Sequence, residues 1–301
     1  MQKITPHLWY DKEAKEASKF YVSAFGEDSK VTMLKTLHDT PSGDVDIVSF
    51  ELAGQEFMAI SAGPLFKLNP SVSMHVRCKT KEEVDALWAK FSKGGSVLME
   101  LGSYPFSEHY GWVQDKYGLS WQFIYVGVQP FVQRITPMMM FTGKVCGKAE
   151  EAINFYSTVF KDSEVTYMVR YGKNEEPDKD GSVKIAHFKL EGQEFAAMDS
   201  AHPHKFQFNE AISFVVNCET QKQIDFFWEK LSADPKFEQC GWLKDKFGFS
   251  WQVVPTAMGE MMKTGTKAQI DRVTKAFLPM KKFDLAKLEE AYHGEAVKAS
   301  H

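Results

Sequence analysis

Two histidines in the second half of the chain stand close enough together to share a ligand. His202 and His204 flank a proline, and Asp199 comes shortly before them. Two imidazoles in this spacing can bind a metal ion, but a stable protein site normally adds at least one more ligand. The pattern therefore favours a solvated loop at the mouth of a cavity, with Asp199 and His202 as candidates for ligand binding.

Cys240 has the most reactive surroundings of the cysteines. Lys244 and Lys246 follow it, and a neighbouring positive charge favours the nucleophilic thiolate. Nucleophilic catalysis also needs a positioned base. A buried, unreactive thiol is the favoured interpretation, and Cys240 stays a ligand-binding candidate. The cysteines at 78, 146, 218 and 240 form no C-x-x-C pair, which indicates reduced thiols in a reducing compartment.

A repeated phrase defines the elements that must position these side chains. Residues 111–124 and 241–254 share Gly, Trp, Asp, Lys, Gly, Ser, Trp and Gln in the same order. Each copy predicts two strands joined by a tight turn at the second Gly. In the strand after the turn, alternation places Ser and Gln on one face and Trp on the other. If the Gln faces a cavity, the Trp faces the helices.

The repetition extends over most of the chain and predicts an α+β architecture with two β-α-β-β-β modules in each half. The first helix of each half carries Phe-Tyr on its apolar face, at 20–21 and 155–156. The second helix of each half begins with a capping box, Thr80 with Glu83 and Thr220 with Gln223. The predicted units are a first domain at 1–128, a second domain at 134–256 and a C-terminal helical tail at 259–301.

The tail has no counterpart in the first half. Apolar residues between Gln269 and Phe277 predict one helix, and Asp284 can cap a second. We expect the apolar face of the tail to pack on the two domains or on a second chain.

Composition narrows the class of protein. The chain has 301 residues, of which 44% are apolar and 25% charged, as in globular proteins. A formal charge of −4 argues against nucleic acid as a partner. No apolar run is long enough to span a membrane, and the first residues do not form a signal peptide. We expect a cytoplasmic protein with no membrane partner.

The paired modules, the Phe-Tyr of the first helix and the pattern D-K-[YF]-G-x-S-W-Q together resemble the vicinal oxygen chelate superfamily, which includes glyoxalases and bleomycin-resistance proteins. Within it, the chain is similar to the PhnB-like branch, whose domain is called 3-demethylubiquinone-9 3-methyltransferase. Residues 206–218 and 240–255 carry most of this likeness. It implies tandem glyoxalase-like domains, each a cupped, eight-stranded sheet of two modules. The two halves would form an internal pseudo-dimer, and a homodimer of two chains stays open.

The methyltransferase name finds no support in the residues. Methyl transfer from S-adenosylmethionine usually needs a nucleotide site, and the chain has no glycine-rich strand-turn-helix followed by an acidic residue. The sequence therefore does not favour this activity.

The resemblance also implies positions for a divalent metal, which superfamily enzymes hold with His, Glu or Gln. The matching residues are His7, Ser73 and Gln122 in the first half and Met138, Ser213 and Gln252 in the second. Serine is a poor ligand, methionine binds hard ions weakly, and a neutral amide supplies no charge. The sequence predicts no cofactor, leaves a divalent metal open with His7 and Gln122 as weak ligands, and favours hydrogen-bonded glutamines inside the cups.

Three further residues complete the candidates for ligand binding. His75 lies on the same strand face as Ser73 and is expected to be a hydrogen-bonded cavity histidine. His109 belongs to the segment 102–110, which could close over the first cup. Phe208 could stack on a planar ligand, although such residues more often belong to the core.

The leading hypothesis is a protein that binds a small, partly aromatic ligand in one or both cups without the family metal. One alternative is a lyase, isomerase or dioxygenase that uses a divalent metal in one cup, with His7 and Gln122 as ligands. Another is a non-catalytic structural or regulatory subunit that docks through its tail. Whether any reaction is catalysed, and by which residues, stays open.

Overall fold

The repeated sequence folds into four modules of similar pattern, followed by a helical tail. The structure is a computed structural model that describes residues 2–294. The first half contains β1 (Ile4–Tyr10), α1 (Ala14–Phe25), β2 (Lys30–Thr40), β3 (Gly43–Leu52) and β4 (Gln55–Ser61), then β5 (Val72–Cys78), α2 (Lys81–Phe91), β6 (Ser96–Tyr104), β7 (Ser107–Gln114) and β8 (Ser120–Tyr125). The second half contains β9 (Ile135–Thr142), α3 (Ala149–Val159), β10 (Glu164–Arg170), β11 (Val183–Leu190) and β12 (Gln193–Ser200), then β13 (Ile212–Cys218), α4 (Gln221–Leu231), β14 (Trp242–Lys244) and β15 (Ser250–Pro255).

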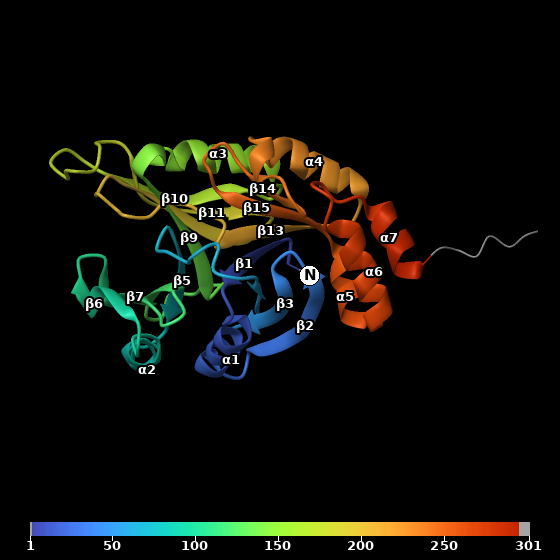
Figure 1. Cartoon of the computed structure of the whole chain (residues 1–301). Helices are drawn as coiled ribbons and strands as arrows, with labels where there is room; N and C mark the ends of the chain where they lie inside the picture. Colours follow the sequence, from blue (N-terminus) through green and yellow to red (C-terminus); the bar gives the residue numbers. More distant parts are fainter. Residues whose placement is uncertain (1, 295–301) are drawn as a thin grey trace, which may run out of the picture.

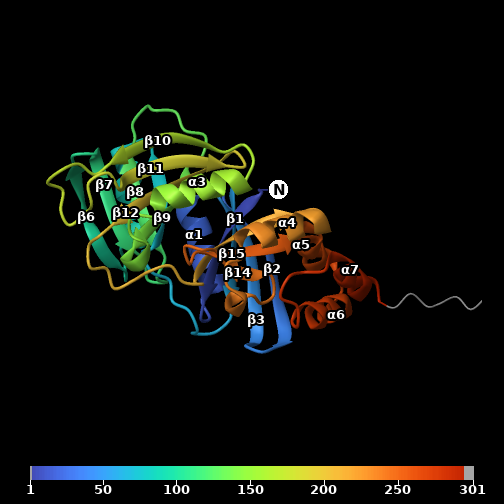
Figure 2. The same cartoon turned by 90° about the horizontal axis from the view of Figure 1, so that it is seen from above.

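The strands of residues 2–294 form two sheets, and each sheet combines modules from both halves (Figures 1 and 2). Sheet A has the order β14-β15-β13-β1-β4-β3-β2, and sheet B has the order β10-β11-β12-β9-β5-β8-β7-β6. The two modules of a sheet meet at an antiparallel pair, β1 with β13 and β5 with β9. The chain therefore contains an internal pseudo-dimer with exchanged modules.

The two sheets differ in strand number within the described residues. Sheet B has the eight strands that the resemblance implies, whereas sheet A has seven. The difference arises in the second half, where a short 3-10 turn, Pro235–Phe237, stands in place of a strand like β6.

The helices α1–α4 cover one face of each sheet, and the opposite face is called here the cup face, cup A on sheet A and cup B on sheet B. The tryptophan after each repeated turn lies on the helix side, fully buried. Trp121 packs against Phe91 with ring centroids 4.8 Å apart, and Trp251 packs against Tyr156 at 5.3 Å. The alternation predicted from the sequence is confirmed, because the neighbouring glutamines face the cups.

Each repeated phrase carries a buried aspartate that organises the turn between its two strands. Asp245 accepts hydrogen bonds from the hydroxyl of Tyr156 (2.7 Å), the indole of Trp251 (2.8 Å) and the backbone N–H groups of Phe247 and Phe249. Asp115 makes the corresponding bonds in the first half. One carboxylate thus shapes the turn and joins the first helix of a half to its last strand.

The predicted capping boxes form only in part. Thr80 and Thr220 accept hydrogen bonds from the backbone N–H of Glu83 and Gln223, as expected. The side chain of Glu83, however, accepts from Lys79 N–H rather than from the N-cap residue. Gln223 likewise accepts from Glu219 N–H, so in both helices the returning side chain satisfies the N–H one residue before the N-cap.

The tail forms three helices, which pack on sheet A (Figure 2). They are α5 (Thr256–Thr264), α6 (Lys267–Phe277) and α7 (Leu285–His293). The predictions of α6 and of α7 with its Asp284 cap are confirmed, but α5 was not predicted. Residues 295–301 of the predicted tail lie outside the described residues. None of the helices in residues 2–294 combines the length and the apolar character needed to cross a membrane.

Candidate ligand-binding site

The module exchange decides which predicted metal positions meet. His7 on β1 pairs with Ser213 on β13, and Gln252 donates a hydrogen bond to Ser213 at 2.9 Å. His7 is buried, its ring meets Trp242 edge-on at 5.4 Å, and burial lowers its pKa to about 3. Cup A therefore combines one neutral imidazole with a hydroxyl and an amide that bind each other.

The equivalent positions of cup B form a closed hydrogen-bond network. The amide nitrogen of Gln122 lies 2.7 Å from Ser73 Oγ and 3.3 Å from Met138 Sδ. Its oxygen accepts from the Tyr110 hydroxyl at 2.7 Å. The amide is thus satisfied by protein groups on both sides, as predicted for the glutamines.

These arrangements do not fit the divalent metal of the superfamily. The predicted pair of His7 and Gln122 is a wrong combination, because the two residues lie in different sheets. Neither trio contains a carboxylate, and each glutamine donates to its serine rather than presenting oxygen to a cation. Within the described residues, no group of three or more His, Cys, Asp or Glu side chains is arranged to hold a metal ion.

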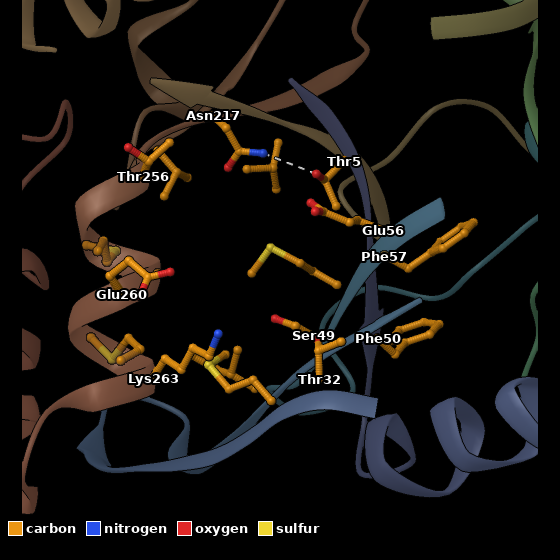
Figure 3. Close-up of a pocket in the computed structure, with 18 of the residues that line it drawn as sticks. Thr5, Thr32, Ser49, Phe50, Glu56, Phe57, Asn217, Thr256, Glu260 and Lys263 are labelled. Atoms are coloured by element: carbon orange, nitrogen blue, oxygen red, sulfur yellow. Dashed lines mark hydrogen bonds between the residues drawn. The ribbon is translucent and has the colours of Figure 1, made fainter. Parts of the chain in front are cut away.

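A cavity of about 560 Å³ lies between cup A and helix α5 (Figure 3). The floor comes from β1–β4 and β13, and α5 forms the opposite wall. Its volume is within the range of pockets that enclose small organic ligands. The cavity lies beside the His7 trio, on the strand positions toward Thr5 and Asn217.

Polar groups are arranged around this cavity in a definite pattern. On the sheet side, Asn217 donates to Thr5 Oγ1 at 3.1 Å, and Ser49 and Glu56 lie nearby. From the opposite wall, Figure 3 shows Glu260 and Lys263 directed toward the sheet. A ligand could therefore meet both signs of charge at the α5 wall, and hydroxyl groups, an amide and the Glu56 carboxylate at the sheet.

Most of the remaining lining is apolar and adaptable, and Lys30, Thr32, Glu51 and Thr256 add further polar groups. Four methionines contribute, Met33 and Met58 from the sheet and Met258 and Met262 from α5. Methionine is unbranched and polarisable, so it adjusts to ligands of irregular shape and makes favourable contacts with aromatic rings. This lining suits a molecule with a partly aromatic body.

The cavity depends on docking of the tail at the second repeated phrase. The N–H groups of Cys240 and Gly241 donate to the carbonyls of Met280 and Lys281, at 2.8 Å and 2.7 Å. Phe283 fills the space above Gly241, where an added Cβ would lie 2.4 Å from the phenyl ring. Gly241 also has φ +82°, a conformation that L-residues rarely adopt.

We expect Gly241→Ala to loosen the tail from sheet A. The matched control is Gly248→Ala, because Gly248 has φ +77° but open space at its Cβ position. Both variants carry the cost of a positive φ, about 1 kcal/mol, and only G241A adds the clash with Phe283. Hydrogen exchange of residues 256–293 should rise in G241A and stay near wild type in G248A. Equal exchange in the two variants would contradict this account of docking.

Cys240 contributes to this docking surface. Its thiol lies 3.4 Å from the carbonyl oxygen of Leu278, and burial raises its pKa. Cys240 is half-buried, so the prediction of a buried thiol is met only in part, and its lack of reactivity stays a prediction. No lysine takes part, because Lys244 pairs with Glu210 at 2.9 Å.

His109 does not close over a cup. The predicted loop 102–110 is a hairpin of β6 and β7, and His109 turns toward the helix side, 2.6 Å from Asp85 on α2. Alternation explains the error, since Tyr110, the next residue, faces cup B through its bond to Gln122.

Asp199 has a structural task. It is buried and accepts hydrogen bonds from the backbone N–H groups of Gly147 (2.7 Å), Ala149 (3.1 Å) and Val183 (2.9 Å). The first two bonds satisfy the start of α3, and the third holds the start of β11. Burial raises the pKa of the carboxyl, and the three N–H donors oppose that shift.

The remaining second-half candidates also lie away from the cavity. His202 is exposed and sits 3.7 Å from Asp178, and His204 lies 2.8 Å from Ser200 Oγ. The favoured interpretation of a solvated loop fits this arrangement. Phe208 is buried in the core between Phe141 and Phe249, on the helix side of the sheet.

The residues that line the cavity were mostly missed from the sequence. Thr5, Ser49 and Met58 alternate with core residues in their strands, so the period-2 pattern could have placed them on the cup face. Glu260 and Lys263 gave no such signal, because α5 was not predicted and has no counterpart in the first half.

Comparison with known proteins agrees with this architecture. Glyoxalase I from Zea mays is 13% identical, covers 86% of this chain and 96% of its own length, and gives a TM-score of 0.54. A PhnB protein from Bacillus cereus is 38% identical and covers 42% of this chain and 100% of its own, with a TM-score of 0.39. Among curated proteins, none matches the chain.

The fold and the paired modules define a tandem glyoxalase-like protein of the vicinal oxygen chelate fold. The sequence model of one family, 3-demethylubiquinone-9 3-methyltransferase, matches residues 2–124 and 133–254. The chain belongs to this family, with one copy of its domain in each half.

Proposed function

We propose that this protein binds a small, partly aromatic molecule in the cavity between cup A and α5, without a divalent metal of the superfamily type. The observation that carries the proposal is the partly open cavity of about 560 Å³ on the cup face. Protein pockets of this kind combine a mostly apolar lining with a few placed polar groups. In this cavity, methionines supply much of the apolar lining. The placed polar groups belong to Thr5, Ser49, Glu260 and Lys263.

The absence of metal belongs to the proposal and is tested separately. His7 is the single imidazole of its trio, and Ser213 and Gln252 are engaged with each other. Metal analysis of protein purified without chelator should give less than one equivalent per chain. Stoichiometric Zn²⁺, Ni²⁺ or Mn²⁺ that disappears in His7→Met would favour the metal-dependent enzyme instead.

The family name adds no activity to this proposal. A nucleotide cofactor for methyl transfer usually lies at a glycine-rich turn between a strand and a helix. The turns that lead from β1 to α1 and from β9 to α3 differ from this pattern, because no G-x-G-x-x-G occurs in them.

Filling the cavity should abolish binding. Met58 lies on β4 and faces the cavity, so Met58→Trp would occupy space that the ligand needs. The matched control is Ala196→Met, which places the cup A residue at the equivalent position of cup B and leaves the cavity unchanged. Native mass spectrometry of protein as purified, and titration with 8-anilinonaphthalene-1-sulfonate, measure occupancy. We expect at least a tenfold loss of affinity in M58W and wild-type affinity in A196M.

Two results would count against the cavity as the binding site. One is equal binding by M58W and wild type. The other is loss of binding in A196M alone. Circular dichroism of both variants confirms that the fold is intact before binding is compared.

A further inference from the structure

Cup B carries a second cluster of polar side chains, at the positions that correspond to the cavity of cup A. His75 on β5 lies directly opposite Thr136 on β9, so their side chains share the cup face. His187 on β11 reaches the same place, with its ring centroid 6.2 Å from that of His75. Sequence equivalence relates these three residues to Val215, Thr5 and Ser49, which all line the cavity of cup A.

Each member of this cluster has a buried polar atom without a partner. These atoms are Nδ1 of His75, Nδ1 of His187 and Oγ1 of Thr136. His75 is 8% exposed and Thr136 is fully buried. Buried polar groups in proteins are normally hydrogen-bonded, so three of them without a protein partner at one place indicate a site that a ligand completes. The prediction of a hydrogen-bonded His75 is therefore not met at Nδ1.

The comparison with cup A shows how the cluster arose. Thr5 accepts a hydrogen bond from Asn217, but cup B has Arg77 at the position of Asn217. Arg77 turns to Glu194, 2.5 Å away, and to the carbonyl of Gln133. Thr136 thereby loses the partner that its counterpart has.

Space also differs between the two cups. In cup B, Ala196 on β12 pairs with Met138 on β9. The equivalent position of cup A holds Met58 on β4, which pairs with His7 on β1. The alanine side chain is smaller than methionine, so it covers less of the floor of cup B at this position. The helices α5–α7 pack on sheet A, so the roof of cup A does not extend to sheet B (Figure 1).

The hydrogen-bonding groups of the cluster indicate which kind of ligand it can bind. A neutral imidazole and a hydroxyl can each donate one hydrogen bond, so the three groups can converge on acceptor oxygens. Arg77 adds positive potential, which disfavours a cation, and its ion pair with Glu194 reduces this effect. We propose that His75, His187 and Thr136 form a second binding site, which takes a small carboxylate. This proposal is independent of ligand binding in cup A.

Aromatic side chains at the edges suit a carboxylate on a flat apolar body. Tyr167 on β10 is half exposed and lies 6.0 Å from the ring of His187. On the other side, Tyr110 packs edge-on against Phe106 at 5.0 Å and reaches Gln122 with its hydroxyl. Benzoate is therefore a suitable probe.

Binding of a carboxylate should be coupled to proton uptake. Burial lowers the pKa of His75 to about 3 and also lowers the pKa of His187, and Arg77 adds to both shifts. Glu194 opposes the shift of His187, and Tyr167 is the other titratable group at its ring. A bound carboxylate favours the protonated imidazoles, so both pKa values should rise on binding.

The experiment is a calorimetric titration with sodium benzoate at pH 6 in two buffers of different ionisation enthalpy. It uses M58W as background, so that cup A does not contribute. The test variant is H75V/H187S, which places the cup A residues in cup B and leaves the fold pattern unchanged. We expect saturable binding with proton uptake in M58W and at least a tenfold weaker binding after the double substitution.

Three outcomes would overturn the carboxylate site. One is no saturable benzoate binding in either protein. Another is binding that the double substitution leaves unchanged. The third is tight binding of Ni²⁺ or Zn²⁺ that depends on His75 and His187 while benzoate does not bind, which would make the pair a metal site. Because M58W removes the contribution of cup A from both proteins, these outcomes report on cup B.

Discussion

Replacing His7 by Met and His75 by Val should remove much of the acid sensitivity of the folded protein. Both imidazoles are buried, and burial lowers the pKa of each from 6.5 to about 3. The substitutions are conservative for this fold, because Met138 and Val215 occupy the equivalent positions of the other cup. The variant therefore keeps apolar packing while it removes two titrating groups.

The sign of the effect follows from where each histidine binds its proton. The unfolded chain takes up the proton near pH 6.5, whereas the folded chain resists it down to about pH 3. Stability is then complete above pH 6.5 and falls as the pH decreases toward 3. Between pH 8 and pH 5, linkage gives a loss of about 2 kcal/mol for each histidine.

The measurement is urea unfolding of the wild type and of H7M/H75V at pH 8, 6 and 5. The difference in stability between the two proteins should change by about 4 kcal/mol over this range, in favour of the variant at low pH. Other groups, such as Asp115 with its pKa raised to about 6 by burial, titrate in both proteins and cancel in the comparison. Parallel pH profiles for the two proteins would show that the histidines bind protons equally in the folded and unfolded states, so that burial does not lower their pKa.

The strands and their facing residues could be predicted because they depend on local pattern. Gln122 and Gln252 face the cups, and the neighbouring tryptophans face the helices, as alternation requires. The hydrogen bonds of both glutamines to serines follow from the same faces. A duplicated sequence strengthens such predictions, because each copy tests the other.

The partners of these residues could not be predicted, because they depend on which copy of a strand is next to β1. Strands β5 and β13 are both short, apolar and similar in sequence, so either could complete the hydrogen bonds of β1. The chain uses β13, which brings His7 to Ser213 and Gln252 instead of Ser73 and Gln122. The residues of these strands do not indicate whether β1 pairs with β5 or with β13.

Helix α5, which forms one wall of the cavity, could not be predicted for a different reason. Helix α5 has Gly259 in its middle and no capping side chain at Pro255, so the usual signals of a helix are weak. Its formation depends on packing, since Met261 and Met262 are buried with the rest of the tail against sheet A. Tertiary contact therefore created the part of the site that carries Glu260 and Lys263.

Asp245→Ala should be among the most destabilising single substitutions in the chain. The carboxylate is buried and accepts four hydrogen bonds from the groups described above. Alanine leaves two backbone N–H groups, a phenol and an indole without an acceptor. Since each buried unsatisfied group costs about 1–3 kcal/mol, we expect a loss of about 4 kcal/mol or more in the free energy of unfolding.

Two further variants separate the contributions to this effect. Tyr156→Phe removes one donor and leaves three bonds in place, so it should cost about 1 kcal/mol. Asp115→Ala repeats the experiment in the first half, where Tyr21 and Trp121 donate to the same kind of carboxylate at 2.8 Å and 2.9 Å. Equilibrium unfolding by tryptophan fluorescence and by circular dichroism measures all three. If D245A unfolds at the denaturant concentration of the wild type, the aspartate is not the group that joins helix and strand.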